Sequence, residues 1–204
     1  MVRVFAHSIC WVPLVWLIYA GIYHQLGGDP QTKLMHELGF WGLVFLLLSL
    51  SVTPLKFLFS KLNLIAYRRM LGLYAFWYLF LHLLTYIAFY LYFDFGELTN
   101  EIVERPYIAV GFAGLLLMLP LALTSTKGAQ RRLKKKWKQL HQLSYLILIL
   151  GFVHFVWQSK SDLNEPLAYI LWGSLLFGIR VYKRYPKLFF KSPTETKGIL
   201  NNED

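Results

Sequence analysis

Two histidines of the sequence lie inside long apolar segments. His82 belongs to the stretch YLFLHLLTYIAF, within a run from 70 to 93 that contains no Asp, Glu, Lys or Arg. His154 lies in a similar context, FVHFVW. An unsatisfied polar group in hydrocarbon is costly, so ionisable residues within membrane segments usually serve a function. Because neutral imidazole is a common metal ligand, both histidines are candidate ligands.

The two histidines are predicted to lie at similar depths in a membrane. His82 follows Arg69, the last basic residue before its segment, by 13 residues, or about 20 Å at helical rise. His154 follows Lys138 by 16 residues, or about 24 Å. Two imidazoles that face each other across a helical bundle are the usual way to hold a b-type haem in a membrane. We therefore predict a bis-histidine haem site; the alternative is that each histidine bonds a Ser, Thr or Tyr of a neighbouring helix.

The other four histidines give weaker signals. His141 lies about 5 Å inside the boundary of its segment, where it would suit a second, inner haem. Its counterpart would have to lie near Arg69, where no histidine occurs, so an interfacial role is the alternative. His7 and His24 lie at segment ends and are interpreted as interfacial, and the spacing of His36 assigns it no role.

The composition is that of a membrane protein. The chain has 204 residues, of which 56% are hydrophobic and only 16% charged, and its mean hydropathy is +0.45. Backbone groups surrounded by membrane lipid must be satisfied within the chain, which favours helices. We predict an all-α fold with six transmembrane helices in a haem-binding bundle over residues 1–190, followed by a disordered tail at 191–204. No internal repeat is evident, and no signal-peptide cleavage site follows the first segment. The predicted spans are 5–26, 36–58, 67–93, 106–125, 138–158 and 165–183.

The charges are distributed very unevenly between the two sides of this topology. Nearly all of the 21 basic residues fall on one side, and only Lys33, Arg105 and Lys160 fall on the other, together with most of the acidic residues. The positive-inside rule then places both termini in the cytoplasm. The net charge of +10 is therefore interpreted as a topology signal, and no nucleic-acid partner is expected.

The motifs that would mark a self-contained enzyme do not occur. A single cysteine, Cys10, excludes a CxxC pair or a Cys-ligated cluster, and there is no GxGxxG after a strand, no P-loop and no HExxH. The pattern predicts one electron-carrying subunit of a larger system, with no catalytic residue of its own unless it oxidises quinol. The basic side would neutralise flavin phosphate, haem propionates or an acidic donor protein. We predict cofactor contacts there for Arg69, Arg131 and Arg132, with plain topology determination as the alternative.

Several blocks resemble the MsrQ (YedZ) family, the haem-binding membrane subunits of bacterial periplasmic methionine sulfoxide reductase systems, within the wider ferric-reductase-like transmembrane group. The resemblance runs over about residues 20–185. The blocks, in order, are LGGDP, RRMLGL, LHLLTY, ERPYIAVGF, LALTST, QLHQLSYL and VHFVW.

The resemblance implies a multi-pass protein of the bacterial inner membrane that binds haem b, in one or two copies, and FMN. It would pass electrons from the quinone pool or a cytosolic flavin reductase to a periplasmic molybdopterin-containing catalytic subunit, with which it forms a heterodimer. That partner would reduce methionine sulfoxide in oxidised envelope proteins. Carried over onto this chain, the haem ligands are His82, His141 and His154.

Two further blocks concern the outer surface. The family's RPY block falls on Arg105, Pro106 and Tyr107. In the block that begins at His36, family members often read His-x-x-Gly-Arg, whereas this chain reads HELGF, with Phe40 in place of the arginine. A role for His36 at the site is therefore in doubt.

Two other functions are weighed against this one. A ferric or superoxide-type reductase module with a separate flavoprotein donor would use the same haem and deliver electrons to a different acceptor. A transporter or non-redox scaffold would use its histidines as proton relays or packing groups. Secondary transporters have paired, Gly- or Pro-interrupted helices, which this sequence does not resemble, so that function ranks last.

The histidine pair yields a direct prediction. We expect His82→Ala and His154→Ala each to lose most of the bound haem while still inserting into the membrane, because each removes one of two axial ligands. The measurement is the Soret absorbance of purified protein, normalised to protein. Normal Soret intensity in both variants would rule out the bis-histidine assignment.

Overall fold

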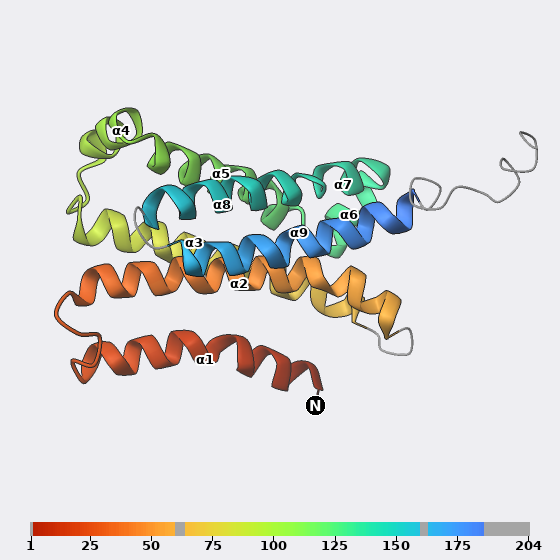
Figure 1. Ribbon diagram of the computed structural model, residues 1–204, viewed down its shortest axis with the longest axis horizontal. Helices are drawn as coiled ribbons and strands as arrows, with labels where there is room; N and C mark the ends of the chain where they lie inside the picture. The colour runs from red at the N-terminus through yellow and green to blue at the C-terminus, as the bar shows by residue number, and fades with distance from the viewer. Residues whose placement is uncertain (1, 60–63, 160–162, 186–204) are drawn as a thin grey trace, which may run out of the picture.

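The computed structural model describes residues 2–59, 64–159 and 163–185, and every regular element within these ranges is an α-helix (Figure 1). The predicted tail at 191–204 lies outside the described residues. The helices are α1 (Val2–Ile22), α2 (Pro30–Leu58), α3 (Ile65–Phe89), α4 (Phe95–Glu104), α5 (Pro106–Leu123), α6 (Lys127–Leu133), α7 (Lys135–Leu140), α8 (Leu143–Ser159) and α9 (Asn164–Arg184).

Five segments are long and apolar enough to cross a membrane, and they match the first five predicted spans. The sixth predicted span forms α9, which is 21 residues long but carries Glu165, Arg180 and Lys183 and does not reach the same apolar character. The prediction of an all-helical, multi-pass membrane protein is confirmed. The five segments are Val4–Ile22, Pro30–Phe57, Ile65–Phe89, Pro106–Leu123 and Lys135–Ser159.

The long helices lie side by side and alternate in direction (Figure 1). The start of α1 and the end of α9 lie at one end of the bundle, together with α6 and α7. We call this the basic end, because α6 and α7 carry the sequence KGAQRRL-K-KKWKQL. The opposite end holds the α1–α2 turn and α4, and we call it the acidic end, because the acidic residues of the described ranges gather there: Asp29, Glu37, Asp94, Glu97, Glu101, Glu104 and Glu165.

Helix α2 forms the centre of the bundle. Its side chains at Phe45, Leu47 and Leu50 are buried, and it packs along α3. Gly42 permits that close packing, because a Cβ there would lie 2.6 Å from Cγ of Leu79. A core of this density tolerates little added volume at such a contact.

A buried tyrosine of α3 bonds the backbone of helix α1. Tyr78 of α3 donates a hydrogen bond to the Cys10 carbonyl at 2.8 Å and accepts one from the Leu14 amide at 3.1 Å. These two backbone groups of α1 would otherwise bond each other, and Pro13 lies beside them. A proline inside a helix disturbs the local ladder, so the hydroxyl satisfies groups that lipid could not. Much of the rest of α1 exposes apolar side chains, as a lipid-facing helix does.

Helix α4 was not predicted from the sequence. Asp94 begins it as N-cap, its side chain accepting hydrogen bonds from the amides of Gly96 at 2.8 Å and Glu97 at 3.1 Å. An acidic residue at the third helical position, here Glu97, further favours a helix start. The sequence therefore carries a capping signal for α4, but the segment is too polar to be recognised as a membrane span. Asp29 caps α2 in a similar way, and hydrogen bonds from the Thr32 side chain and amide lower the pKa of its carboxyl.

The fifth predicted span is interrupted at its basic end. The helix stops at Leu140 and resumes at Leu143, because the backbone switches to shorter-range bonds, from the Gln142 amide to Gln139 and from the Tyr145 amide to Gln142. The Ser144 hydroxyl also bonds the His141 carbonyl at 2.8 Å. Side chains that bond nearby carbonyls compete with the helical ladder in this way.

The cap of α4 can be tested directly. We expect Asp94→Ala to speed hydrogen exchange at the first amides of α4 by roughly fivefold, because losing such a cap costs about 1 kcal/mol. Asp94→Asn keeps an accepting oxygen and serves as the matched control. Unchanged exchange at Gly96 and Glu97 in Asp94→Ala would show that the cap does not stabilise this helix.

Candidate functional site

The structure brings His82 and His154 together. His82 projects from α3 and His154 from α8, and their ring centroids are 6.2 Å apart with an angle of 81° between the ring planes. The two helices run in the same direction (Figure 1), and the short distance between the rings places the histidines at matching depth, as the sequence predicted. The alternative in which each imidazole bonds a hydroxyl group does not apply, because both bond backbone carbonyls instead.

Each imidazole is held through its Nδ1 atom. Nδ1 of His82 lies 2.8 Å from the Met35 carbonyl oxygen of α2, and Nδ1 of His154 lies 2.7 Å from the Tyr107 carbonyl oxygen of α5. A carbonyl only accepts, so Nδ1 must carry the proton in both rings. Nε2 of each neutral ring then carries a lone pair, and a neutral imidazole binds a metal through this lone pair.

Two glycines make room for these rings. Gly39 follows Met35 by one helical turn, and a Cβ there would lie 3.0 Å from Nδ1 of His82. Gly111 stands in the same relation to Tyr107, and its Cβ would lie 2.7 Å from Nδ1 of His154. A Cβ at Gly111 would force His154 to move, and a Cβ at Gly39 would require His82 to shift by a few tenths of an ångström, so glycine at both positions favours the approach of the histidines to the carbonyls.

The two halves of the site repeat each other. A shift of 72 residues carries Gly39 onto Gly111 and His82 onto His154, and the surrounding sequences GFWGL and GFAGL, FLHLL and FVHFV correspond. The α2–α3 pair and the α5–α8 pair therefore present equivalent histidines toward each other. The absence of an internal repeat expected from the sequence is thus wrong for this part of the chain. The repeat was missed because its few matching residues are scattered among interchangeable apolar ones.

The spacing of the rings suits a metal between them. Two metal–nitrogen bonds of about 2 Å, with roughly 1 Å from each nitrogen to its ring centre, span about 6 Å. Two imidazoles supply only two ligands, so the remaining ligands must come with the metal, as they do in a porphyrin. The free Nε2 atoms and the glycine cradle that a Cβ would fill both fit haem.

A cavity of about 280 Å³ surrounds the pair. Its walls are mostly apolar and come from α2, α3, α5 and α8, and Leu98 of α4 also lines it at the acidic end. An apolar enclosure keeps water from a bound metal and adds dispersion contacts to a flat ligand. The apolar residues that line it include Phe40, Leu43, Leu46, Leu79, Leu83, Ile108, Phe112, Leu115, Ile147 and Phe155.

Apart from the two central histidines, the polar side chains that line the cavity among the described residues lie toward the acidic end. Tyr86 donates a hydrogen bond to Glu101 at 2.6 Å, and Glu101 pairs with Nε of Arg105 at 3.1 Å. On the other side, the Gln158 amide lies 2.8 Å from Nε2 of His36. A hydrogen bond with the Tyr107 side chain and the Glu101 carboxylate raise the pKa of Arg105.

These residues were not predicted as site residues, although signals for two of them existed. Tyr86 follows His82 by four residues, and Gln158 follows His154 by four. Each therefore lies on the same face of its helix as that histidine. His36, whose role the sequence left in doubt, lies at the cavity wall. Phe40 also lines the cavity and meets Tyr169 edge-on, with ring centroids 5.5 Å apart.

His141 does not join the other two histidines. It caps α7 at the basic end, stacks on Trp137 with centroids 3.9 Å apart, and its Nδ1 lies 3.1 Å from the Trp137 carbonyl oxygen. Its Nε2 is buried without a hydrogen-bond partner among the described residues. That free nitrogen is a possible ligand position, but no second described histidine faces it.

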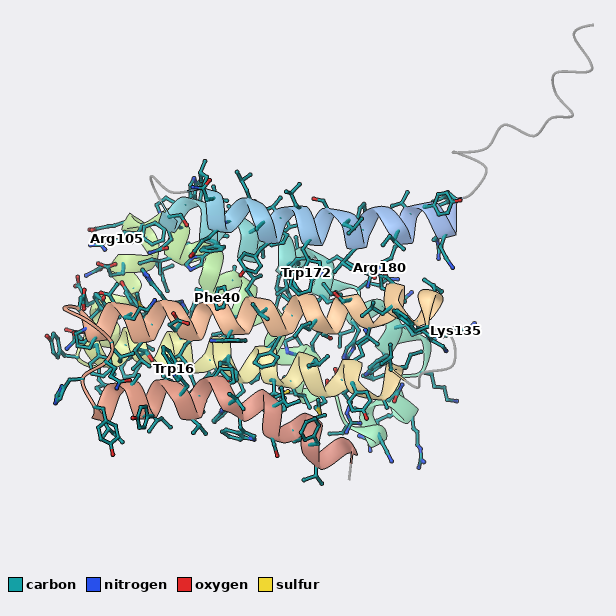
Figure 2. All side chains as sticks on the ribbon, turned by 60° about the horizontal axis from the view of Figure 1, so that its bottom comes forward. Trp16, Phe40, Arg105, Lys135, Trp172 and Arg180 are labelled. Carbon is teal, nitrogen blue, oxygen red and sulfur yellow. The ribbon has the colours of Figure 1, made fainter. Side chains whose placement is uncertain are left out.

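The predicted arginines also lie at the basic end. Arg69 on α3 and Arg131 and Arg132 on α6 are exposed, and none of them lines the cavity. Figure 2 shows the separation, with Arg105 at one end of the bundle and Lys135 at the other. Arg180 of α9 lies between helices near this end, bonds the Leu50 carbonyl and packs over the Tyr145 ring at 5.5 Å.

Comparison with known proteins places the chain in a family. The family described as ferric reductase like transmembrane component matches residues 38–152. The heme-binding subunit MsrQ of protein-methionine-sulfoxide reductase from Xanthomonas euvesicatoria pv. vesicatoria is 46% identical over 169 residues, 83% of this chain and 78% of the relative. The chain belongs to the MsrQ family. This confirms the resemblance read from the sequence blocks.

Other MsrQ subunits agree with this assignment. The MsrQ of Rhodospirillum rubrum is 43% identical over 180 residues, covering 88% of this chain and 86% of the relative. The MsrQ of Xanthomonas campestris pv. campestris is 48% identical over 159 residues, or 78% of this chain and 73% of the relative. No solved structure matches the chain.

The glycine cradle gives a graded prediction. We expect Gly111→Ala to displace His154 and reduce haem retention several-fold, and Gly39→Ala to have a smaller effect, because its Cβ meets His82 at 3.0 Å rather than 2.7 Å. Gly178→Ala in α9 is the control, since nothing lies within 4 Å of that position. The readout is the Soret absorbance and the low-spin electron paramagnetic resonance signal. Equal retention in Gly111→Ala and Gly178→Ala would contradict the cradle.

Proposed function

We propose that this chain is the membrane electron carrier of a methionine sulfoxide reductase system and that it holds haem b between His82 and His154. The proposal rests on one observation above all: two imidazoles with free Nε2 atoms, 6.2 Å apart, in a largely apolar cavity. The relatives are named heme-binding subunits of protein-methionine-sulfoxide reductase, which supports the same function.

The residues of this chain would perform three tasks for that cofactor. Haem iron supplies one-electron redox chemistry when it is bound. His82 and His154 would hold the iron through their Nε2 atoms, and the Met35 and Tyr107 carbonyls keep their rings in one tautomer and orientation. The apolar wall would keep water from both imidazoles, which favours their neutral, metal-binding form.

The basic end is the proposed place of electron entry. A quinol of the quinone pool or a cytosolic flavin reductase would donate there, and Arg69, Arg131 and Arg132 would contact the phosphate of FMN or another anion. Exposed cations without nearby acidic residues in the described part of α3 and α6 suit an anionic ligand. The buried, unpartnered Nε2 of His141 is the candidate ligand atom for a second haem.

The acidic end is the proposed place of electron exit. We place α9 in the membrane as the sixth span, with both termini in the cytoplasm of a bacterium and α4 at the periplasmic surface. The alternating helix directions and the collection of basic residues at one end support this orientation. A molybdopterin-containing catalytic subunit in the periplasm would then bind near the acidic end of the cavity and form a heterodimer with this chain.

A ferric-reductase-type module is the second candidate. It is favoured by the family description that matches residues 38–152. The same haem site would serve it, with ferric iron as the acceptor and a separate flavoprotein as the donor. The acceptor therefore separates the two functions.

The first experiment is a reduced-minus-oxidised spectrum of the detergent-purified chain with a pyridine haemochrome assay. We expect a b-type spectrum with one or two haems per chain. Dithionite-reduced protein should be reoxidised by the periplasmic catalytic subunit with methionine sulfoxide, and not by that subunit alone. A flat spectrum after haem-replete expression would refute the function, and reoxidation only by ferric citrate would favour the alternative.

The His141→Ala variant tests the second haem. We expect it to slow reduction from the cytoplasmic side while the spectrum of the His82–His154 haem is kept, because His141 does not line that cavity. Stopped-flow reduction by a flavin reductase measures the first effect and the haemochrome ratio the second. Equal haem loss in the His82, His141 and His154 variants would show that the three histidines share one cofactor.

A further inference from the structure

The cavity has a polar end and an apolar end. Toward the basic end, its wall consists of Leu46, Leu115, Ile147 and small residues such as Gly114. Toward the acidic end, it is lined by Arg105, Tyr86, Tyr107, His36 and Gln158. Haem b has the same asymmetry, since two carboxylates project from one edge of an otherwise apolar disc. Burying carboxylates against leucine is strongly unfavourable unless they are paired, so only one end of this cavity suits them.

Arg105 is the only arginine or lysine that lines this cavity among the described residues. Its Nε bonds Glu101 at 3.1 Å, and Glu101 is itself held by the Tyr86 hydroxyl at 2.6 Å. A guanidinium has five N–H donors in a planar fork, so its terminal nitrogens can pair with a second carboxylate. Glu101 thus orients Arg105 without using all of its donors.

Across the acidic end of the cavity from Arg105, neutral groups can donate hydrogen bonds. Gln158 of α8 follows His154 by one turn and lies 2.8 Å from Nε2 of His36 on α2. The amide carries two N–H groups, so one remains for a ligand when the other bonds the imidazole. Arg105, the cap residue between α4 and α5, and Gln158 of α8 both reach the cavity wall.

We infer that the haem is seated with its propionate edge toward the acidic end, where Arg105 pairs with one propionate and Gln158 donates to the other. This inference rests on the proposed function, and it assigns anchoring of the haem of this cavity to Arg105, leaving Arg69, Arg131 and Arg132 for a ligand at the basic end. The propionate edge would then face the side at which electrons leave.

The test compares the midpoint potential of Arg105→Gln with that of the unsubstituted chain. Removing the cation leaves a propionate charge that stabilises ferric iron, so we expect the potential to fall. A fall of about 59 mV corresponds to a tenfold change in the ferrous-to-ferric ratio at fixed potential. Lys33→Gln is a matched control: Lys33 is also half exposed, lies at the acidic end and pairs with a carboxylate four residues away, but it does not line the cavity.

A second cofactor makes the test specific for the propionates. Both chains are reconstituted with iron protoporphyrin IX and with its dimethyl ester, which lacks the two carboxylates. We expect Arg105→Gln to lower the potential and weaken binding more with the free acid than with the ester. An equal shift with the ester, or an equal shift in Lys33→Gln, would overturn the assignment.

The remaining outcomes separate this inference from the proposed function. If Arg105→Gln does not accumulate, Arg105→Lys carries the comparison, with a smaller shift expected because lysine keeps the charge and loses the fork. If Arg132→Gln rather than either Arg105 variant lowers the potential, the propionates face the basic end and the inference is wrong. An unsubstituted chain that binds no haem refutes the proposed function itself.

Discussion

The hydrogen bonds from the two imidazoles to backbone carbonyls are the interactions on which the proposed site depends. In a water-free interior such a bond is strong, and an imidazole without one would be costly. His82 and His154 each meet a carbonyl of the neighbouring helix, at 2.8 and 2.7 Å. One bond therefore satisfies the ring, fixes its tautomer and aims Nε2 into the cavity. Each depends on a glycine one turn further along the accepting helix.

That arrangement also explains the close pairing of α2 with α3 and of α5 with α8. The glycines let each histidine lie against the backbone of its partner helix, and Gly42 brings α2 close to Leu79 of α3 in addition. Because the same set of contacts occurs twice, 72 residues apart, the two rings approach the cavity from equivalent positions. Twofold equivalence of this kind is what a flat ligand with one axial nitrogen on each face requires.

The distribution of polar groups then distinguishes the two ends. Acidic residues and the hydrogen-bonded residues Tyr86, Glu101 and Arg105 lie at the acidic end of the cavity. The cations of α6 and α7 lie at the basic end with His141. The proposed transfer of electrons from one surface to the other would use this chemical difference between the ends. Short helices create the difference: α4 brings Glu101 to the acidic end of the cavity, and the break after Leu140 makes His141 the C-cap of α7.

The sequence by itself determined the class of fold and singled out the two central histidines. Long apolar runs in lipid can only be helices, and distance along a helix converts directly into depth, so His82 and His154 could be matched from counting alone. Tertiary structure decided the rest. Helices that are apolar on all sides carry no periodic signal for which face meets which neighbour, so the carbonyl partners, the glycine cradle and the repeat were hidden. Arg105 is separated from His82 and His154 in sequence by a capped helix and a span, and only their packing brings it to the cavity that the histidines share.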